Sequence, residues 1–272
     1  MNPYEITEPT CISFSGGRTS AYMLYKVLEA GGGQLPTHAI VCFANTGKED
    51  ESTLKFVQSC SDNWKVEIHW LEYRDAEPAF VRVDFKTASR NGEPFEALIR
   101  KRQYLPNPVT RFCTSELKIR TIHKYLKSLG WEHNETMDWL GMRADEQRRA
   151  AKIADKSRIP LVTAGVTKEI VGEFWRNQSF DLELPNMNGV TAHGNCDLCF
   201  LKGGAQVLSL IAEKPERGIW WAKMEALALA SKPSGAVFRS DRPSYASMIK
   251  FAAEQKDMFD PNEEAIPCLC GD

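Results

Sequence analysis

The amino-acid sequence predicts an α/β fold: a parallel twisted sheet with helices on both faces, followed by a helical C-terminal part. Through roughly the first seventy residues, short apolar runs alternate with helical patterns, as they do where crossover helices join parallel strands. Beyond residue 200 the pattern becomes helical. The chain has 272 residues, 43% of them hydrophobic, so it is long enough to bury one large core or a core with an appendage.

The strands and helices of the first half are assigned from local patterns. Strands are expected at residues 11–12, 39–44 and 66–71, because each of these runs is apolar and short. A helix is expected to follow residue 20, and another to run from about residue 52 to residue 59. Glu49 and Asp50, which stand just before this second helix, are expected to cap it.

Later elements complete the predicted organisation. A helix is expected from residue 114 or 115 to residue 128, with Gly130 as its stop, and a buried strand over residues 137–141. Three further helices are expected over residues 201–213, 218–230 and 245–254. The sequence therefore predicts an α/β domain over residues 1–200 and a helical region with a cysteine-containing tail over residues 201–272, packed on the first.

Charge and composition exclude some classes of protein. The net charge of −2 gives no global basic character that would indicate a nucleic-acid-binding protein. No apolar run is long enough to span a bilayer, and the N-terminus lacks the pattern of a secretory signal. We therefore expect a cytoplasmic protein with no membrane partner. The sequence leaves its oligomeric state open.

A serine- and glycine-rich turn follows the first predicted strand. Residues 13–20 read Ser-Phe-Ser-Gly-Gly-Arg-Thr-Ser, and a helix is expected directly after them. Glycines let a turn point several N–H groups inward, and the helix N-terminus adds partial positive charge, so this arrangement favours a bound phosphate. The lysine-containing P-loop motif and the dinucleotide-binding glycine motif are both absent. An ordinary tight turn is the alternative interpretation.

The end of the second predicted strand supports the phosphate interpretation. Asn45, Thr46 and Gly47 follow that strand. Ligands of open parallel sheets bind beyond the carboxyl ends of the strands, so this segment is expected beside the serine- and glycine-rich turn. The two segments together predict a nucleotide site.

The eight cysteines fall into two groups. Cys11, Cys42 and Cys60 lie within predicted strands or a helix and are interpreted as small core residues. The others have spacings typical of ligands for one metal centre, either an iron–sulfur cluster or a zinc ion held by four thiolates. These candidate ligands are Cys113, Cys196, Cys199, Cys268 and Cys270.

Residues 74–112 show little periodicity but carry many cations. A solvated loop face is one interpretation, and a mobile cover over a polyanionic substrate is the other. Among these cations are Arg82, Lys86, Arg90, Arg100, Lys101, Arg102 and Arg111.

In their order along the chain, these motifs resemble those of the phosphoadenosine-phosphosulfate (PAPS) reductase-like family, within the PP-loop superfamily of adenine-nucleotide α-hydrolases. The resemblance is to the iron–sulfur members in particular, and it implies a Rossmann-like PP-loop fold. Besides the motifs above, it is carried by Arg111-Phe112-Cys113 with Lys118, by Gly141-Met142-Arg143 with Arg149, and by Arg217-Gly218. Thr19 and Phe112 depart from the family pattern, which has an aspartate and a further cysteine at these places.

The resemblance implies roles for individual residues. Lys118 and Arg143 would offset substrate charge, and Cys270 would be the thiolate that attacks sulfur. A [4Fe–4S] cluster would bind Cys113, Cys196, Cys199 and a tail cysteine, Cys268 or Cys270. An adenine nucleotide (PAPS, adenosine phosphosulfate or ATP) would be bound by Ser13, Ser15, Gly16, Gly17, Arg18, Thr19, Ser20, Asn45, Thr46, Gly47 and Arg149.

Three functions are compatible with these motifs. The first is reduction of a sulfonucleotide, with a thiol carrier such as thioredoxin as reductant. The second is ATP-dependent adenylation of a nucleic acid followed by sulfur transfer, as in tRNA thiolases or DNA phosphorothioation systems. The third is a zinc-stapled nucleotide sensor that is not an enzyme.

Overall fold

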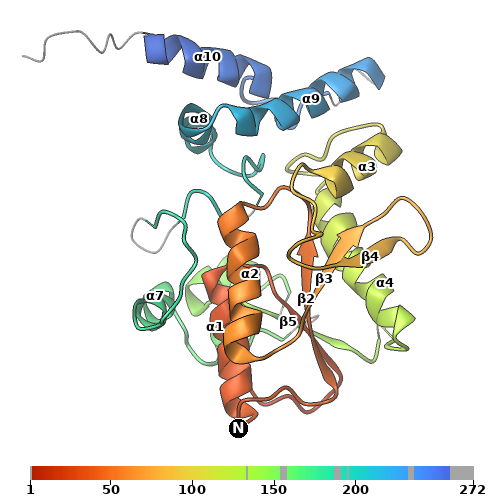
Figure 1. Cartoon of the computed structure of the whole chain (residues 1–272), viewed down its shortest axis with the longest axis vertical. Coiled ribbons are helices and arrows are strands. Elements are labelled where there is room, and N and C mark those ends of the chain that lie inside the picture. Colours follow the sequence, from red (N-terminus) through yellow and green to blue (C-terminus); the bar gives the residue numbers. More distant parts are fainter. Residues whose placement is uncertain are drawn as a thin grey trace, which may run out of the picture.

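The computed structural model describes residues 2–132, 134–153, 158–186, 191–194, 196–231 and 236–257. It confirms the predicted α/β class (Figure 1). Five strands form one sheet in the order β4-β3-β2-β1-β5. The strands β1 (Thr10–Ser13), β2 (Ala39–Asn45), β3 (Ile68–Tyr73) and β5 (Met137–Leu140) are parallel to one another, and β4 (Phe80–Val83) pairs antiparallel with β3.

Helices cover both faces of this sheet. On one face, α1 (Arg18–Ala30) and α2 (Glu51–Trp64) pack on Ile12, Val41 and Phe43, and α7 (Lys168–Arg176) lies beside α1. On the other face, α4 (Thr121–Ser128) packs on Cys11 and Cys42. Because successive side chains of a strand point to opposite faces, a strand covered on both sides is apolar throughout. The predicted core cysteines, Cys11, Cys42 and Cys60, are all fully buried.

A helical layer with its own apolar core follows in the sequence. It consists of α8 (Gly204–Glu213), α9 (Glu216–Ser231) and α10 (Tyr245–Asp257), and α3 (Glu93–Arg102) packs against α9. These bounds confirm the three helices predicted beyond residue 200. In Figure 1 the layer lies at the top, beyond the end of the sheet to which β2 points. None of the helices among the described residues is both long and apolar enough to cross a membrane.

Residues 74–112 are more ordered than the sequence predicts. They contain β4 and α3, and five of their eight lysines and arginines pair with carboxylates. The strand and the helix in this region were not predicted, whereas the paired cations remain largely exposed, as a solvated face requires. The helix predicted from residue 114 or 115 to residue 128 is present, but it begins as a π-helix, η1 (Thr114–Arg120), before it continues as α4. Short helices complete the chain: η2 (Ala144–Glu146), α5 (Gln147–Ala150) and α6 (Pro160–Thr163).

The strand order creates a crevice next to β1. The chain moves from β1 to β2 on one side, and β5 later joins β1 on the other side. Between two parallel strands whose connections leave in opposite directions, the following loops separate and leave a space beyond the carboxyl ends. The sheet topology therefore places this space where the loops after β1 and β5 meet.

Candidate functional site

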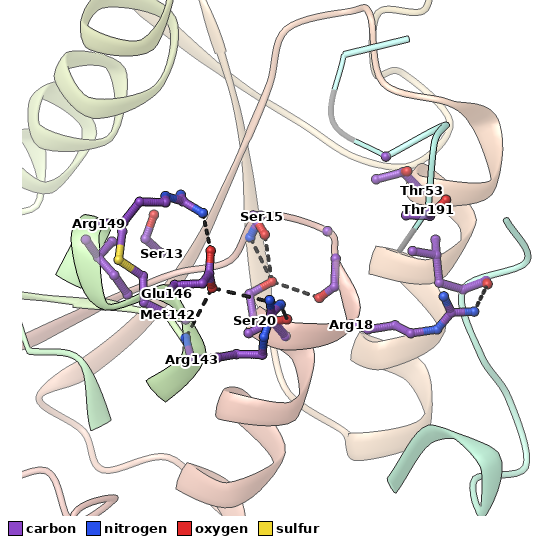
Figure 2. A pocket seen from close by; sticks show the side chains of 17 residues that line it. Ser13, Ser15, Arg18, Ser20, Thr53, Met142, Arg143, Glu146, Arg149 and Thr191 are labelled. Atoms are coloured by element: carbon purple, nitrogen blue, oxygen red, sulfur yellow. Dashed lines mark hydrogen bonds and ion pairs between the residues drawn. The ribbon is translucent and has the colours of Figure 1, made fainter. Parts of the chain in front are cut away.

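A cavity of about 370 Å³ occupies this crevice. We call it the serine–glycine cavity, because its main wall is the loop over residues 15–20, between β1 and α1. The opposite wall is formed by residues 140–143 at the end of β5, and Arg149 and Thr53 also line it. The predicted loop thus lies at the switch point of the sheet (Figure 2).

The loop is shaped by hydrogen bonds among its own residues. The Ser15 backbone N–H donates to Ser20 Oγ (3.1 Å), the two serine hydroxyls are 2.9 Å apart, and Ser20 Oγ donates to the Gly17 carbonyl (3.0 Å). Gly16 has φ +74°, and a Cβ there would lie 2.7 Å from Thr53 Cγ2. A side chain at this position would therefore strain the backbone and collide with α2.

The loop leads directly into the N-terminus of α1. Gly17 is the N-cap, so the N–H groups of Arg18, Thr19 and Ser20 begin the helix and have no partner within it. Such N–H groups and the partial positive charge of the helix end attract anions. These residues were predicted to bind phosphate, and their backbone is arranged for it.

Two arginines face the loop from the segment after β5. Arg143 Nη1 donates to Thr19 Oγ1 (3.2 Å), and its Nε donates to Asp145 (3.0 Å). The hydrogen bond to Asp145 raises the pKa of Arg143 above its ordinary value. Arg149 pairs with Glu146, which also lines the cavity. Figure 2 shows Arg143, Glu146 and Arg149 together on one side of the loop.

Arg18 also lines the serine–glycine cavity, but its guanidinium group is paired with an acid. Its side chain lies on the other side of the loop (Figure 2) and donates to both carboxylate oxygens of Asp181, at 2.6 and 2.8 Å. It also donates to the Leu182 carbonyl at 2.6 Å. The guanidinium group therefore ties α1 to the segment after α7.

A second and larger cavity of about 720 Å³ adjoins the first. We call it the thiol cavity, because Cys113, Cys196 and Cys199 all line it. Arg149, Thr191 and Gly194 line both cavities, so the two share a wall. The structure thus brings three of the five predicted metal-binding cysteines to one space, directly beside the serine–glycine cavity.

The three cysteines come from two separate elements. Cys113 is the N-cap of η1, whose next turn carries Lys118. Cys196 and Cys199 belong to one tight turn, in which the Cys199 N–H donates to the Cys196 carbonyl (3.2 Å). Thr46, after β2, contacts Cys196, with its Oγ1 at 3.4 Å from Cys196 Sγ. Because π-helical turns are wider than α-helical ones, they often mark functional positions.

The charged side chains that line the thiol cavity are cations. Four cations line it, and none of the described lining residues is an aspartate or glutamate. Glu49 lies just outside, with its carboxylate 3.7 Å from Lys118 Nζ. A cavity with this lining favours anionic occupants. The cations are Arg111, Lys118, Arg149 and Lys202.

These charges perturb the groups in the cavity. Burial, and then the Glu49 carboxylate, raise the pKa of the Cys196 thiol, whereas Lys118 acts in the opposite sense. Burial, and then Cys199, also raise the pKa of Cys113. Burial alone would lower the pKa of Lys118, but Glu49 and the three sulfurs raise it overall. The thiols of Cys113 and Cys196 therefore keep their protons at neutral pH unless a metal displaces them.

The segment after β2 contributes less to binding than the sequence predicts. Asn45 and Gly47 line neither cavity. The Asn45 amide instead donates to Glu72 Oε1 (2.6 Å) and to the Ser89 carbonyl (2.9 Å). Thr46 lines the thiol cavity. These contacts assign Asn45 a role in joining β2 to β3.

The expectation that Glu49 and Asp50 both cap α2 was half wrong. Asp50 is the N-cap and accepts a hydrogen bond from the Ser52 N–H (3.0 Å). Glu49 turns the other way, because its carboxylate accepts from the Thr46 N–H (2.9 Å) and from the Thr46 hydroxyl. It is a buried acid beside the thiol cavity.

The sequence analysis missed Lys202 as a candidate residue. Its Nζ donates to the Ala192 and Gly194 carbonyls, both at 2.6 Å, and the side chain lines the thiol cavity. Burial lowers the pKa of Lys202. It follows Cys199 by three residues, and this spacing was the available signal, since it places the lysine in the same turn region as the thiols.

Two predicted ligands, Cys268 and Cys270, lie outside the described residues. Within the part of the chain that is described, no group of three or more histidine, cysteine, aspartate or glutamate side chains is close enough together to hold one metal ion. The described residues therefore place three thiols around one cavity.

Fold and site together define an α/β protein with an anion-type cavity at the switch point of a parallel sheet and a thiol-lined cavity beside it. No known family profile matches the chain. In a comparison spanning 217 residues that covers 76% of this chain and 70% of the relative, it is 30% identical to a protein of Escherichia phage lambda described as "Uncharacterized nin region protein ORF290". The chain belongs to the family of this phage protein.

Proposed function

We propose that this protein is a PP-loop enzyme similar to PAPS reductases, which binds an adenine sulfonucleotide and reduces its sulfo group. The observation that carries the proposal is the wall shared by the two cavities, formed by Arg149, Thr191 and Gly194. A nucleotide held by its phosphate in one cavity would present its sulfur end toward the thiols of the other. The sequence motifs support the same pairing of anion and sulfur chemistry.

In this proposal the serine–glycine loop holds the phosphate of the substrate. The N–H groups of the first turn of α1 and the hydroxyls of Ser15 and Ser20 donate hydrogen bonds to it. Arg143 and Arg149 balance its negative charge from the segment after β5. Fixed donors in a partly enclosed cavity stabilise charge better than water does, because they need no reorganisation.

The donor set of the thiol cavity fits an iron–sulfur cluster in kind. Cys113, Cys196 and Cys199 supply three sulfurs, and a [4Fe–4S] cluster needs a fourth thiolate. Cys268 or Cys270 is the predicted source. Bound there, the cluster would contribute electrostatic organisation of the site, and the four cations around the cavity support an anionic group of this kind. A zinc ion remains the alternative occupant.

The proposed chemistry uses a tail thiolate. Cys270 attacks the sulfur of the sulfonucleotide, the S–O bond to the phosphate breaks, and adenosine phosphate leaves with the bonding electrons. A thiol of a dithiol such as reduced thioredoxin then attacks Cys270 Sγ of the resulting thiosulfonate, and sulfite leaves. The second thiol of the carrier completes the step, so that Cys270 returns to its thiol and the dithiol is oxidised to a disulfide. Lys118 and Arg143 offset the charge on the sulfo group and the leaving phosphate.

The test uses the full chain purified without oxygen. Labelled PAPS and adenosine phosphosulfate are supplied separately with reduced thioredoxin, and sulfite and adenosine phosphate are measured. We expect equal amounts of both products, and brown protein whose visible absorbance is lost in the Cys199→Ser variant. Cys60→Ser is the matched control, because that cysteine lies in the core away from both cavities.

Three results would contradict the proposal in different ways. Absence of turnover with either sulfonucleotide by metal-loaded protein would remove the reductase. ATP–pyrophosphate exchange stimulated by RNA or DNA would favour sulfur transfer to a nucleic acid. Colourless protein that contains zinc would remove the iron–sulfur assignment.

A further inference from the structure

Three consecutive charged residues after β2 each bind a different part of the site. We call Lys48, Glu49 and Asp50 the charged triplet. Lys48 pairs with Asp197 in the turn that carries two of the cysteines, Glu49 lies against Lys118 of η1, and Asp50 pairs with Arg217 of α9. One short segment thus joins the cysteine turn, η1 and the helical layer.

The pair between Lys48 and Asp197 is the most buried of the three. Lys48 Nζ lies 3.0 Å from Asp197 Oδ2, and the two side chains are 8% and 11% exposed. The backbone joins the same two residues, because the Asp197 N–H donates to the Lys48 carbonyl (2.8 Å). Removing either residue of such a buried ion pair is strongly destabilising, because the charge of the other residue is then left buried and unpaired.

Asp197 stands between the two cysteines of the turn. Its Oδ1 accepts hydrogen bonds from the Trp221 indole N–H (2.8 Å) and from the Leu198 N–H (2.7 Å). Together with Lys48, these donors hold both carboxylate oxygens. The turn from Cys196 to Cys199 is therefore fixed at its centre by one side chain.

Lys48 is held in turn by an aromatic ring. Its ammonium group lies 5.2 Å from the ring centre of Trp220, a distance at which the ring attracts a cation. Trp220 and Trp221 both belong to α9, so this helix contacts Lys48 and Asp197 at once. The lysine has few alternative positions.

We propose that Lys48 is a positioning residue for the thiols of Cys196 and Cys199, and that it acts through Asp197. This inference deepens the proposed function, because those thiols are the ones the proposed cofactor requires. Lys48 lines neither cavity and touches no reacting group. Cys113 is carried by η1, which the Lys48–Asp197 pair does not hold, so it provides an internal reference.

The experiment measures thiol accessibility in the full chain after reduction and metal removal. Iodoacetamide is added, and labelling rates at Cys113, Cys196 and Cys199 are determined separately by mass spectrometry. Lys48→Met is expected to raise the rates at Cys196 and Cys199 relative to Cys113 about tenfold, because the turn opens more often when its anchor is lost. Lys48→Arg keeps the charge and is expected to restore the ratio.

Two further variants keep the test decisive. Asp197→Asn leaves an acceptor for Trp221 but removes the charge, and it serves if Lys48→Met does not fold. Lys250→Met is the matched control, since Lys250 is 79% exposed and pairs with Glu254 on the surface of α10. Unchanged ratios in folded Lys48→Met or Asp197→Asn would overturn the proposal. So would equal increases at all three cysteines, which indicate general loosening.

The labelling result is independent of the proposed function. It needs neither nucleotide nor metal, so a chain without reductase activity can still show the expected ratios. Conversely, a brown and active protein whose Lys48→Met variant keeps the original ratios retains the function and loses this inference. As a second readout, Lys48→Met is expected to bind less iron than Lys48→Arg when both are purified without oxygen.

Discussion

The serine–glycine cavity and the thiol cavity share a wall but are assembled in different ways. The first is built mainly from a continuous loop, whose serines and glycines bond to one another. The second collects its cysteines from η1 and from a turn far along the chain, and ion pairs from the charged triplet connect these parts. A locally built site depends on backbone conformation, whereas a site built by tertiary contacts depends on each contact. The two cavities should therefore respond to different substitutions.

The largest effect is expected from Gly16→Ala, which changes the backbone conformation of the serine–glycine loop. Positive φ and the approach to Thr53 make a methyl group costly here, by about 1–3 kcal/mol of unfolding free energy. Loss of two loop donors to the phosphate would weaken nucleotide binding about a hundredfold. Calorimetric titration with adenosine phosphosulfate measures the affinity, and iodoacetamide labelling of the thiols should stay unchanged.

Gly17→Ala is the matched control for this change. A Cβ at Gly17 would meet only Ser15 Oγ, at an ordinary 3.6 Å, and its φ of −106° suits any residue. Equal losses of affinity in both variants would show that the loop conformation is not what binds the nucleotide. A changed thiol labelling pattern in Gly16→Ala would mean that the cavities are not independent.

A smaller effect is expected from Arg149→Met, which changes the shared wall. Arg149 and its neighbour Arg148 are both exposed, but only Arg149 lines the two cavities among the described residues. Loss of one charge-assisted hydrogen bond should weaken nucleotide binding about tenfold, and Arg148→Met should leave it unchanged. The same titration measures both. Comparable affinities for the two variants would remove Arg149 from the binding site.

The smallest effect concerns pH and the helical layer behind the thiol cavity. Glu225 of α9 accepts hydrogen bonds from the Tyr245 N–H (2.9 Å) and the Phe238 N–H (3.4 Å). Burial raises the pKa of Glu225 above its ordinary value of 4.5. The folded chain then holds a proton that the unfolded chain has lost, so this group's contribution to stability falls as pH rises above 4.5.

Glu225→Gln should reduce this dependence on pH. Thermal unfolding of the two proteins, followed by circular dichroism across the acidic range, measures the difference. As pH rises, we expect the thermal unfolding temperature of the variant to increase relative to that of the parent chain. A constant difference at every pH would mean that Glu225 titrates normally in the folded chain.

Sequence reasoning predicted the parts of the fold that depend on local pattern. Strands covered on both faces read as apolar runs, and the serine–glycine loop is continuous, so both were found. β4 was missed because it is only four residues long and half-exposed, which leaves little alternation to detect. α3 was missed although Gly92, Glu93 and Pro94 form a recognisable helix start, because residues 74–112 show little hydrophobic periodicity.

The site was predicted less completely, because several roles depend on distant partners. Arg18 belongs to a motif that predicts binding, yet Asp181 holds its guanidinium group. The Asn45 amide similarly donates a hydrogen bond to Glu72 on the neighbouring strand. Neither partner can be identified from spacing along the chain. The pairing of most cations in residues 74–112 also leaves little free charge there for a nucleic-acid backbone.

The π-helix η1 has a consequence for how this chain tolerates insertions and deletions. Each residue turns an α-helix by about 100°, so one surplus residue in a wider turn shifts the phase of everything that follows. Here the early part of the helix presents Lys118 to the thiol cavity, while the later part presents Ile122 and Tyr125 to the sheet. The Thr121 hydroxyl closes the wide turn on the Glu116 carbonyl, at 2.8 Å. The π-helical turn thus lets one helix direct Lys118 at the cavity and Ile122 and Tyr125 at the sheet. If one residue were deleted here, the helix could keep only one of these two sets of contacts.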